Sequence, residues 1–315
     1  MFEQKTIAVA VPSYNVEHLV GRVIETMPGY VDHIIVVDDC SRDKTVHVVK
    51  GFMQKDPRIV LLEHESNQGV GGAIVTGYKW ARDHGIDVTV VMAGDAQMDP
   101  ADLNDIIRPV SQEKADYTKG NRLFHGEAWR VIPRHRFFGN SFLSLFTKIA
   151  SGYWHIADSQ SGYTAISLKA LKLLDLDKIY KKYGMPNDIL IRLNELNLKV
   201  KDVPIRPVYN IGEKSGIRLR KVLFTIPWLL FKGFFRRLFI KYVINDFHPL
   251  VFFYLMGIVL TPTGFLFGMY LILHRILSGP VEDTSALFAA FLYISGMQSL
   301  FFAMWFDMDY NKKLR

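Results

Sequence analysis

Hydrophobic and polar positions alternate in a regular rhythm over the first 120 residues of the chain. Short β-branched runs predict strands at 6–11, 33–38, 59–63, 88–93 and 115–119, and helices of about ten residues or more fit between most of them. Alternating strands and helices favour right-handed crossovers and a mainly parallel sheet. The pattern therefore predicts an α/β fold of the Rossmann-like kind.

A different pattern occupies the last quarter, where the runs 250–273 and 285–306 contain no charged residue. As helices, both are long enough to cross about 30 Å of hydrocarbon, and Pro262 in the first is tolerated in membrane helices. The alternative is a buried helical hairpin of a soluble protein. Basic residues flank the pair at its two outer ends: Arg236, Arg237, Lys241, Lys312, Lys313 and Arg315. The positive-inside rule then predicts that both termini are cytoplasmic, and the expected location is a cell membrane or an endoplasmic-reticulum-type membrane.

Charge is concentrated between these two regions. The chain has 38 Lys and Arg against 31 Asp and Glu, a net charge of +7, and the window 212–245 holds eight basic residues and one acid. A local excess indicates a specific anionic partner. Apolar and aromatic runs punctuated by Lys and Arg suit helices in the lipid headgroup region, although an amphipathic helix packed on the first domain is the alternative. Because the charge lies beside a predicted span, no nucleic-acid partner is expected.

These patterns predict three parts: a domain over 1–211, basic juxtamembrane helices over 212–247, and a transmembrane hairpin with a short cytoplasmic tail over 248–315. A single cysteine, Cys40, excludes an internal disulfide and fits a reducing compartment. The first residues are typical of a strand, not of a signal peptide.

Candidate chemistry lies where the predicted strands end, which is where open parallel sheets bind ligands. The first strand ends in "PSYN" (12–15), so Pro12, Tyr14, Asn15 and the following Glu17 are candidates. The second ends in "VVDD", and Asp38 or Asp39 could accept hydrogen bonds from a ribose or base. The alternative is that these acids cap a helix or turn.

Glycines follow the third predicted strand at Gly69, Gly71 and Gly72. They do not follow the first strand and do not have the G-x-G-x-x-G spacing, so a dinucleotide fingerprint and a dehydrogenase are disfavoured. Gly71 is kept as a nucleotide-binding candidate, because these glycines either let the backbone approach a ligand or open a helix.

The stretch "VVMAGDAQMDP" (90–100) turns from apolar to polar at the end of the fourth predicted strand. Asp95 and Gln97 are two residues apart, so in extended geometry they face the same way. A carboxylate and an amide oxygen suit Mg²⁺ or Mn²⁺, which takes its other ligands from phosphate and water. A plain polar turn is the alternative.

Taken in order, several motifs resemble the polyprenyl-phosphate glycosyltransferases of glycosyltransferase family two, the group that includes dolichyl-phosphate mannose and glucose synthases. The matching pieces cover roughly residues 5–215 and are "VPSYN" with Glu17, "VVDDCSRDKT", "NQGVGGA" with Gly77, "MAGDAQMDP", "KGNRL", "DSQSGYTAIS" and "VPIRPVY". The resemblance implies a GT-A catalytic domain that uses a nucleotide sugar and a divalent metal.

The resemblance also implies residue roles. It assigns Pro12, Tyr14, Glu17 and Asp39 to the nucleotide, and Asp95 and Gln97 to the metal. Arg122, together with Arg134 or Arg136, is similar to the family's lipid-phosphate residues, which fits the paired donors of guanidinium. Asp158 and the turn 161–163 are expected to border the sugar pocket, so Asp95, Arg122 and Asp158 form the predicted catalytic set.

Two departures from the family pattern affect the donor site. Many relatives have an acid where this chain has Ala93, and many synthases have an Arg where it has Tyr209; Lys214 or Arg218 are the candidates to replace that arginine. "PNDIL" (186–190) replaces a more usual acidic helix start.

The expected reaction is inverting transfer of a sugar from a UDP- or GDP-sugar to a polyprenyl or dolichyl phosphate. Two alternatives stay open: a processive polysaccharide synthase, which would carry a Q-x-x-R-W motif and more spans, and an inactive membrane scaffold of the same fold. The sequence does not decide the sugar, or between a monomer and a homo-oligomer.

Overall fold

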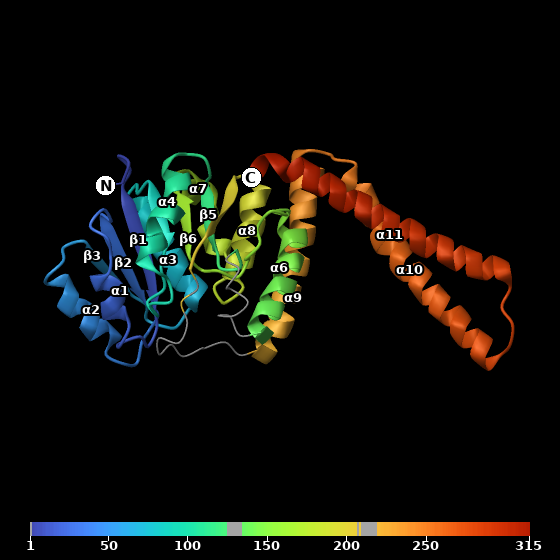
Figure 1. Cartoon of the computed structure of the whole chain (residues 1–315), viewed down its shortest axis with the longest axis horizontal. Coiled ribbons are helices and arrows are strands. Elements are labelled where there is room, and N and C mark those ends of the chain that lie inside the picture. Colours follow the sequence, from blue (N-terminus) through green and yellow to red (C-terminus); the bar gives the residue numbers. More distant parts are fainter. Residues whose placement is uncertain (1, 125–133, 207, 209–218) are drawn as a thin grey trace. The chain divides into compact units, whose positions relative to one another are not determined.

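The computed structural model of the chain describes residues 2–124, 134–206, 208 and 219–315 (Figure 1). For 134–138, 140 and 219–223 only the backbone is described. The chain divides into two compact units, Met1–Phe234 with Leu314–Arg315, and Phe235–Lys313. The boundaries expected at 211 and 247 stay predictions.

The first unit contains a seven-stranded sheet with the order β3-β2-β1-β4-β6-β5-β7. Strands β1 to β4 run parallel, β6 is antiparallel to β4 and to β5, and β5 pairs parallel with β7. The predicted mainly parallel sheet is therefore confirmed. Its strands are β1 (Ile7–Ser13), β2 (His33–Asp38), β3 (Ile59–Glu63), β4 (Val88–Val91), β5 (Tyr117–Asn121), β6 (Thr164–Ser167) and β7 (Val200–Pro204).

Helices cover both faces of this sheet, as the buried, apolar strands require. One core cluster joins β1 and β2 to α1, α2 and α4, and another joins them to α3, α7 and α8. The helices are α1 (Val20–Glu25), α2 (Thr45–Met53), α3 (Val70–Asp83), α4 (Leu103–Ser111), α6 (Arg134–Ser151), α7 (Leu168–Leu173) and α8 (Met185–Glu195).

The strand register places candidate residues level with one another. Ser13 pairs with Asp38, and Asp38 with Glu63, so β1, β2 and β3 end at the same edge. Because β4 pairs with β1 on its other side, the turn that follows β4 also opens at this edge. The carboxyl edge of the sheet thus gathers three of the polar stretches that the sequence singled out.

Helix α9 (Leu219–Phe239) has two contrasting sides within the first unit. Ile226 and Leu230 pack with Ala150 of α6 and Ile191 of α8. On its other side Phe224 and Trp228 are 80% and 62% exposed. The helix therefore does pack against α6 and α8 of the first unit, but it presents large apolar side chains where an ordinary amphipathic helix would present polar ones.

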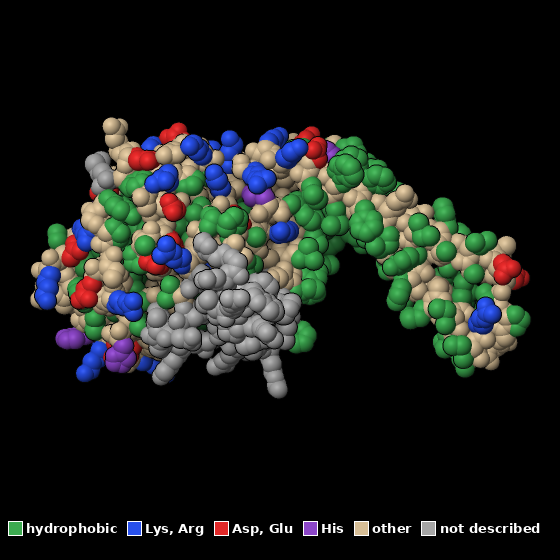
Figure 2. Space-filling view, viewed as in Figure 1, with side chains coloured by type: hydrophobic (Ala, Val, Ile, Leu, Met, Phe, Trp, Pro, Cys, Tyr) green, Lys and Arg blue, Asp and Glu red, His purple; other side chains and the backbone are tan. Residues whose placement is uncertain are grey.

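The second unit is dominated by a hairpin of α10 (Leu250–Leu277) and α11 (Asp283–Asn311). Both helices are long and apolar enough to cross a membrane, with mean hydropathies of 2.0 and 1.6 over their most apolar windows. Only 28% and 22% of those windows is buried, and hydrophobic side chains dominate the hairpin surface in Figure 2. A buried soluble hairpin would show the opposite, so we treat the pair as candidate membrane spans.

Buried polar side chains tie the start of this unit to α11. Arg237 donates to both carboxylate oxygens of Asp307, at 2.8 and 3.1 Å. A π-helical segment, Ile240–Asn245, turns Lys241 and Tyr242 inward; Lys241 donates to Asn311 at 2.6 Å, and the Tyr242 hydroxyl donates to Asp307 at 2.5 Å. Every charge in this cluster has a hydrogen-bonded partner, which is the condition for burying charge in a protein interior.

Candidate active site

Side-chain hydrogen bonds join the loop that follows β1 to the loop that follows β2. The amide oxygen of Asn15, whose φ is +52°, accepts from the Arg42 nitrogen at 2.8 Å. Glu17 accepts from the Lys44 nitrogen at 2.8 Å. Tyr14 remains 45% exposed, and Pro12 is buried in β1. These contacts give Asn15 and Glu17 a structural role here, and their predicted nucleotide role stays a prediction.

Asp38 and Asp39 are both buried, but their carboxylates differ. Both Asp39 oxygens accept backbone hydrogen bonds, from Gln68 and Gly69 at 2.8 Å each. One oxygen of Asp38 accepts from the Ser41 nitrogen at 2.9 Å, whereas its Oδ1 is buried with no hydrogen-bond partner among the described residues. A buried acceptor left open costs stability unless a ligand donates to it, which makes Asp38 the better placed of the two for a nucleotide.

Backbone conformation and close packing explain two of the glycines that follow β3. Gly69 has a φ of +87°, which a residue with a side chain rarely adopts. A side-chain carbon at Gly71 would lie 2.5 Å from the carbonyl oxygen of Tyr180. Close approach of two backbone segments therefore accounts for Gly71, and its assignment to the nucleotide stays a prediction.

The turn after β4 projects Asp95 and Gln97 from the edge of the sheet. Ala96 between them has a φ of +58°, which is uncommon for a residue with a side chain. The Asp95 carboxylate accepts from the Gln97 nitrogen at 3.2 Å. Asp99 then caps a short 3₁₀ helix, Pro100–Asp102, by accepting from the Ala101 nitrogen at 2.9 Å. The turn is thus locally ordered and presents an amide and a carboxylate together.

Arg122, directly after β5, forms an ion pair with Asp158. Its Nε lies 2.7 Å from Asp158 Oδ2 and its Nη2 lies 3.2 Å from Oδ1. Asp158 is fully buried, whereas the Arg122 side chain is 23% exposed. Burial raises the pKa of Asp158, but the Arg122 guanidinium and Lys119 outweigh it and hold that pKa below its ordinary value. The pair is therefore ionised at neutral pH.

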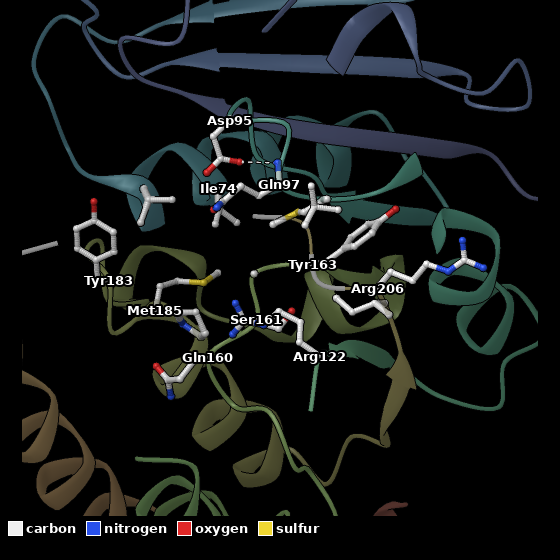
Figure 3. A pocket seen from close by; sticks show the side chains of 16 residues that line it. Ile74, Asp95, Gln97, Arg122, Gln160, Ser161, Tyr163, Tyr183, Met185 and Arg206 are labelled. Atoms are coloured by element: carbon white, nitrogen blue, oxygen red, sulfur yellow. Dashed lines mark hydrogen bonds between the residues drawn. The ribbon is translucent and has the colours of Figure 1, made fainter. Parts of the chain in front are cut away.

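These two parts face one cavity (Figure 3). Asp95 and Gln97 lie on one side of it, and Arg122, Gln160 and Ser161 lie on the opposite side. Tyr183 stands at one end; burial, and then the charge of Asp95, raise its pKa. The remaining lining residues are Val70, Ile74, Met98, Gly162, Tyr163, Met185, Pro186, Ile205, Arg206 and Val208.

Some predicted site residues are brought together here and others are not. The cavity unites Asp95, Gln97 and Arg122, and the turn 161–163 borders it as expected. Asp158 is fully buried and is not a lining residue. The first-strand and second-strand candidates do not line this cavity either. Their roles are left as predictions.

Several basic candidates fall outside what the structure describes. Arg134 and Arg136 are in the first turn of α6, where only the backbone is described, and Lys214, Arg218 and Tyr209 lie outside the described residues. In their place the structure adds Arg206, a cavity-lining residue that the sequence reasoning missed although it stands within the quoted "VPIRPVY". Its position in a motif that matches the family is the feature of the sequence that could have identified it as a site residue.

The donor atoms of the turn fit a hard divalent cation. Asp95 and Gln97 offer only oxygen ligands, and among the described residues no group of three or more His, Cys, Asp and Glu side chains could hold a metal alone. A cation at this turn would therefore share its coordination with ligand phosphate and water, which is how Mg²⁺ is usually bound. Ala93 supplies no side-chain oxygen, so the protein would provide only a few of the cation's ligands.

Comparison with known proteins agrees with the site. Residues 8–174 match the family Glycosyl transferase family 2, and the chain belongs to that family. A glucosyl-3-phosphoglycerate synthase from Mycobacterium tuberculosis, solved with Mn²⁺, UDP and its product, has the same fold, with a TM-score of 0.56 and 19% identity over 73% of this chain and 80% of that one. The fold is GT-A, and the protein is a glycosyltransferase.

Two curated relatives are more similar in sequence. The UDP-N-acetylglucosamine–dolichyl-phosphate N-acetylglucosaminyltransferase of Methanococcus voltae is 32% identical over 250 residues, covering 75% of this chain and 96% of the relative. The undecaprenyl-phosphate mannosyltransferase of Micrococcus luteus is 30% identical, covering 63% of this chain and 82% of the relative. The resemblance drawn from the sequence motifs is confirmed.

Proposed function

We propose that this protein transfers a sugar from a nucleotide-diphosphate sugar, UDP- or GDP-linked, to a polyprenyl or dolichyl phosphate. One observation carries the proposal: a cavity bounded by a carboxylate and amide turn on one side and by an ion-paired arginine on the other. Such a cavity suits a metal-bound diphosphate facing a second anion. Both curated relatives are named for lipid-phosphate acceptors.

On the donor side, Asp95 and Gln97 would hold Mg²⁺ or Mn²⁺. A divalent cation there supplies positive charge to the departing diphosphate. Asp38, through its open Oδ1, would accept a donor from the nucleoside. Tyr183 and Met185 also line the cavity, and their bulk would help to exclude water from the anomeric carbon.

On the acceptor side, Arg122 would bind the lipid phosphate. Phosphate has a second pKa near 6, so at neutral pH the acceptor is largely a dianion and needs no general base. Asp158 holds the guanidinium while the arginine's exposed edge faces the cavity. Attack in line with the leaving group would invert the configuration, and most of the catalysis would come from positioning and charge stabilisation.

Membrane association would bring the acceptor to this site. The candidate spans α10 and α11 and the exposed aromatic side of α9 are both suited to a bilayer, and each basic residue near an anionic surface adds about 1 kcal/mol of attraction. Cytoplasmic termini and a homo-oligomer stay predictions. No observation on the described residues favours a polysaccharide synthase or an inactive scaffold.

The test is to offer the purified protein a panel of nucleotide sugars with a short-chain polyprenyl phosphate and Mn²⁺, and to identify any glycolipid by mass. We expect one donor to give a sugar-phosphate lipid. No lipid-linked product with any donor would overturn the proposal.

The first mutational prediction concerns the metal. Asp95→Asn should leave the unfolding temperature unchanged and remove metal-dependent transfer, because the amide lacks the negative charge that binds the cation. Asp83→Asn, at an exposed position of α3, is the matched control. Unimpaired turnover by Asp95→Asn would contradict the metal role.

A further inference from the structure

The segment 157–161 carries Gln160 and Ser161 to the cavity and holds Asp158 in its ion pair with Arg122. It is anchored near both ends by charged side chains. The Ala157 nitrogen donates to Asp202 Oδ2 of β7 at 2.7 Å. At the other end, Lys119 Nζ of β5 donates to the Ser161 carbonyl oxygen at 2.5 Å. Neither Lys119 nor Asp202 lines the cavity, so neither would contact a ligand there directly.

Asp202 also fixes the other half of the ion pair. The same Oδ2 accepts from Asn121 Nδ2 at 3.0 Å. Arg122 directly follows Asn121, and Asp158 directly follows Ala157. One carboxylate therefore holds the residue before each member of the Arg122–Asp158 pair, and this sets the spacing between the two chain segments that form it.

Burying these charges is costly, which argues that they have a use. Lys119 is fully buried; burial lowers its pKa to about 8, while Asp158 and Asp202 oppose the shift and Arg122 adds to it. Burial raises the pKa of Asp202 to about 6, against Lys119 and Lys148 and with a contribution from Asp158. Between these values, both Lys119 and Asp202 are mainly charged.

We propose that Lys119 and Asp202 are positioning residues that orient Arg122 and the 157–161 segment toward the acceptor anion. The inference rests on the proposed function, because it takes Arg122 to bind the acceptor phosphate. It goes beyond that function because it gives a role to two buried residues that do not line the cavity. Their role would be to fix the positions of the residues on the acceptor side.

The principal variant is Asp202→Asn, which keeps the size and one acceptor oxygen but removes the charge. We expect kcat/KM for the acceptor to fall on the order of 10- to 100-fold, with the donor KM unchanged, because small displacements of a positioned group are expensive. Asn121→Ser, which removes only one of the two ties, should give a smaller loss in the same parameter and covers the case in which Asp202→Asn does not fold.

Lys119→Met tests the second anchor through pH. In the wild type, acceptor kcat/KM should fall above about pH 8 as Lys119 loses its proton. The variant should be slower and lack that alkaline decline. Lys201→Met, at an exposed position of β7, should keep the wild-type profile. An alkaline decline that persists unchanged in Lys119→Met would overturn the role of Lys119.

A readout independent of the acceptor separates this inference from the proposed function. Phenylglyoxal modifies accessible arginines, and mass spectrometry can follow Arg122 alone. Faster Arg122 modification in folded Asp202→Asn or Asn121→Ser would support positioning, whereas wild-type modification rates and wild-type acceptor kinetics would overturn it. If the wild type makes no lipid-linked sugar, the proposed function fails, and the modification rates still decide whether Asp202 positions Arg122.

Discussion

Two arginine–aspartate pairs, one in each unit of the molecule, show how the same chemistry serves different ends. In the catalytic unit Asp158 is fully buried, but Arg122 is 23% exposed and borders the cavity. In the C-terminal unit both Arg237 and Asp307 are fully buried. In the first pair, the open pair, part of the arginine remains accessible to a ligand. In the second, the sealed pair, no part is accessible, and Tyr242 and Asn311 donate further hydrogen bonds to Asp307.

The difference teaches that an ion pair indicates a site only when part of it can be reached. Removing one partner from a sealed pair leaves an uncompensated buried charge, so its main effect falls on stability. Changing the open pair should affect ligand binding first. Three measurements test this contrast.

The largest expected effect is on the sealed pair. Asp307→Asn leaves the Arg237 guanidinium buried without a countercharge and should destabilise the fold by about 3 to 5 kcal/mol. Thermal unfolding of the detergent-solubilised protein measures it. Asp309→Asn, two positions further along α11 and exposed, is the control. Equal unfolding temperatures for the two variants would remove the distinction between the pairs.

The next effect is a pH dependence of stability at the open pair. Lys119, beside Asp158, has an ordinary pKa of 10.5 in the unfolded chain and about 8 in the fold. The unfolded state therefore holds this proton more tightly. Stability should rise by roughly 3 kcal/mol as pH increases from about 8 to above 10.

Lys119→Met should lack this rise, so the difference between variant and wild type, followed by thermal melts from pH 7 to 10.5, isolates it. Over the same range the wild type should lose acceptor turnover while gaining stability. A purely structural lysine would show the gain in stability alone.

The smallest effect is on the open arginine itself. Arg122→Lys keeps a positive charge beside Asp158 but loses the paired donors, so kcat/KM for the acceptor should fall about 100-fold. The unfolding temperature should change little. Arg108→Ala, exposed on α4, is the kinetic control. Equal losses for donor and acceptor would argue that Arg122 does not belong to the acceptor side.

The first five strands of the sheet were predictable because they are apolar and regularly spaced. β2 and β3 have the bounds that the pattern predicts, and β1, β4 and β5 differ by a few residues at their ends. β6 and β7 were not predicted. β6 has only four residues, and β7 exposes Lys201 and Pro204. Pairing with neighbours, and not local pattern, makes these two segments strands.

The site was partly predictable for a similar reason. Asp95, Gln97 and Arg122 stand in quoted motifs and meet at one cavity. Lys119 also stands in a quoted motif, "KGNRL", but its role depends on burial and on Asp202, which is 83 residues away. The Arg237–Asp307 pair joins positions 70 apart. Contacts between residues so far apart in the sequence depend on the fold, so the spacing of residues within a motif does not predict them.

Two glycines bring the backbones of α10 and α11 into close contact, which limits where the hydrocarbon tail of a polyprenyl phosphate could run. Gly264 lies against the backbone of Tyr293, and Gly296 lies against the backbone of Thr261. Because the two backbones are in contact at these glycines, a hydrocarbon chain does not fit between α10 and α11 there. If the acceptor is a polyprenyl phosphate, its tail therefore cannot pass between these two helices at Gly264 and Gly296.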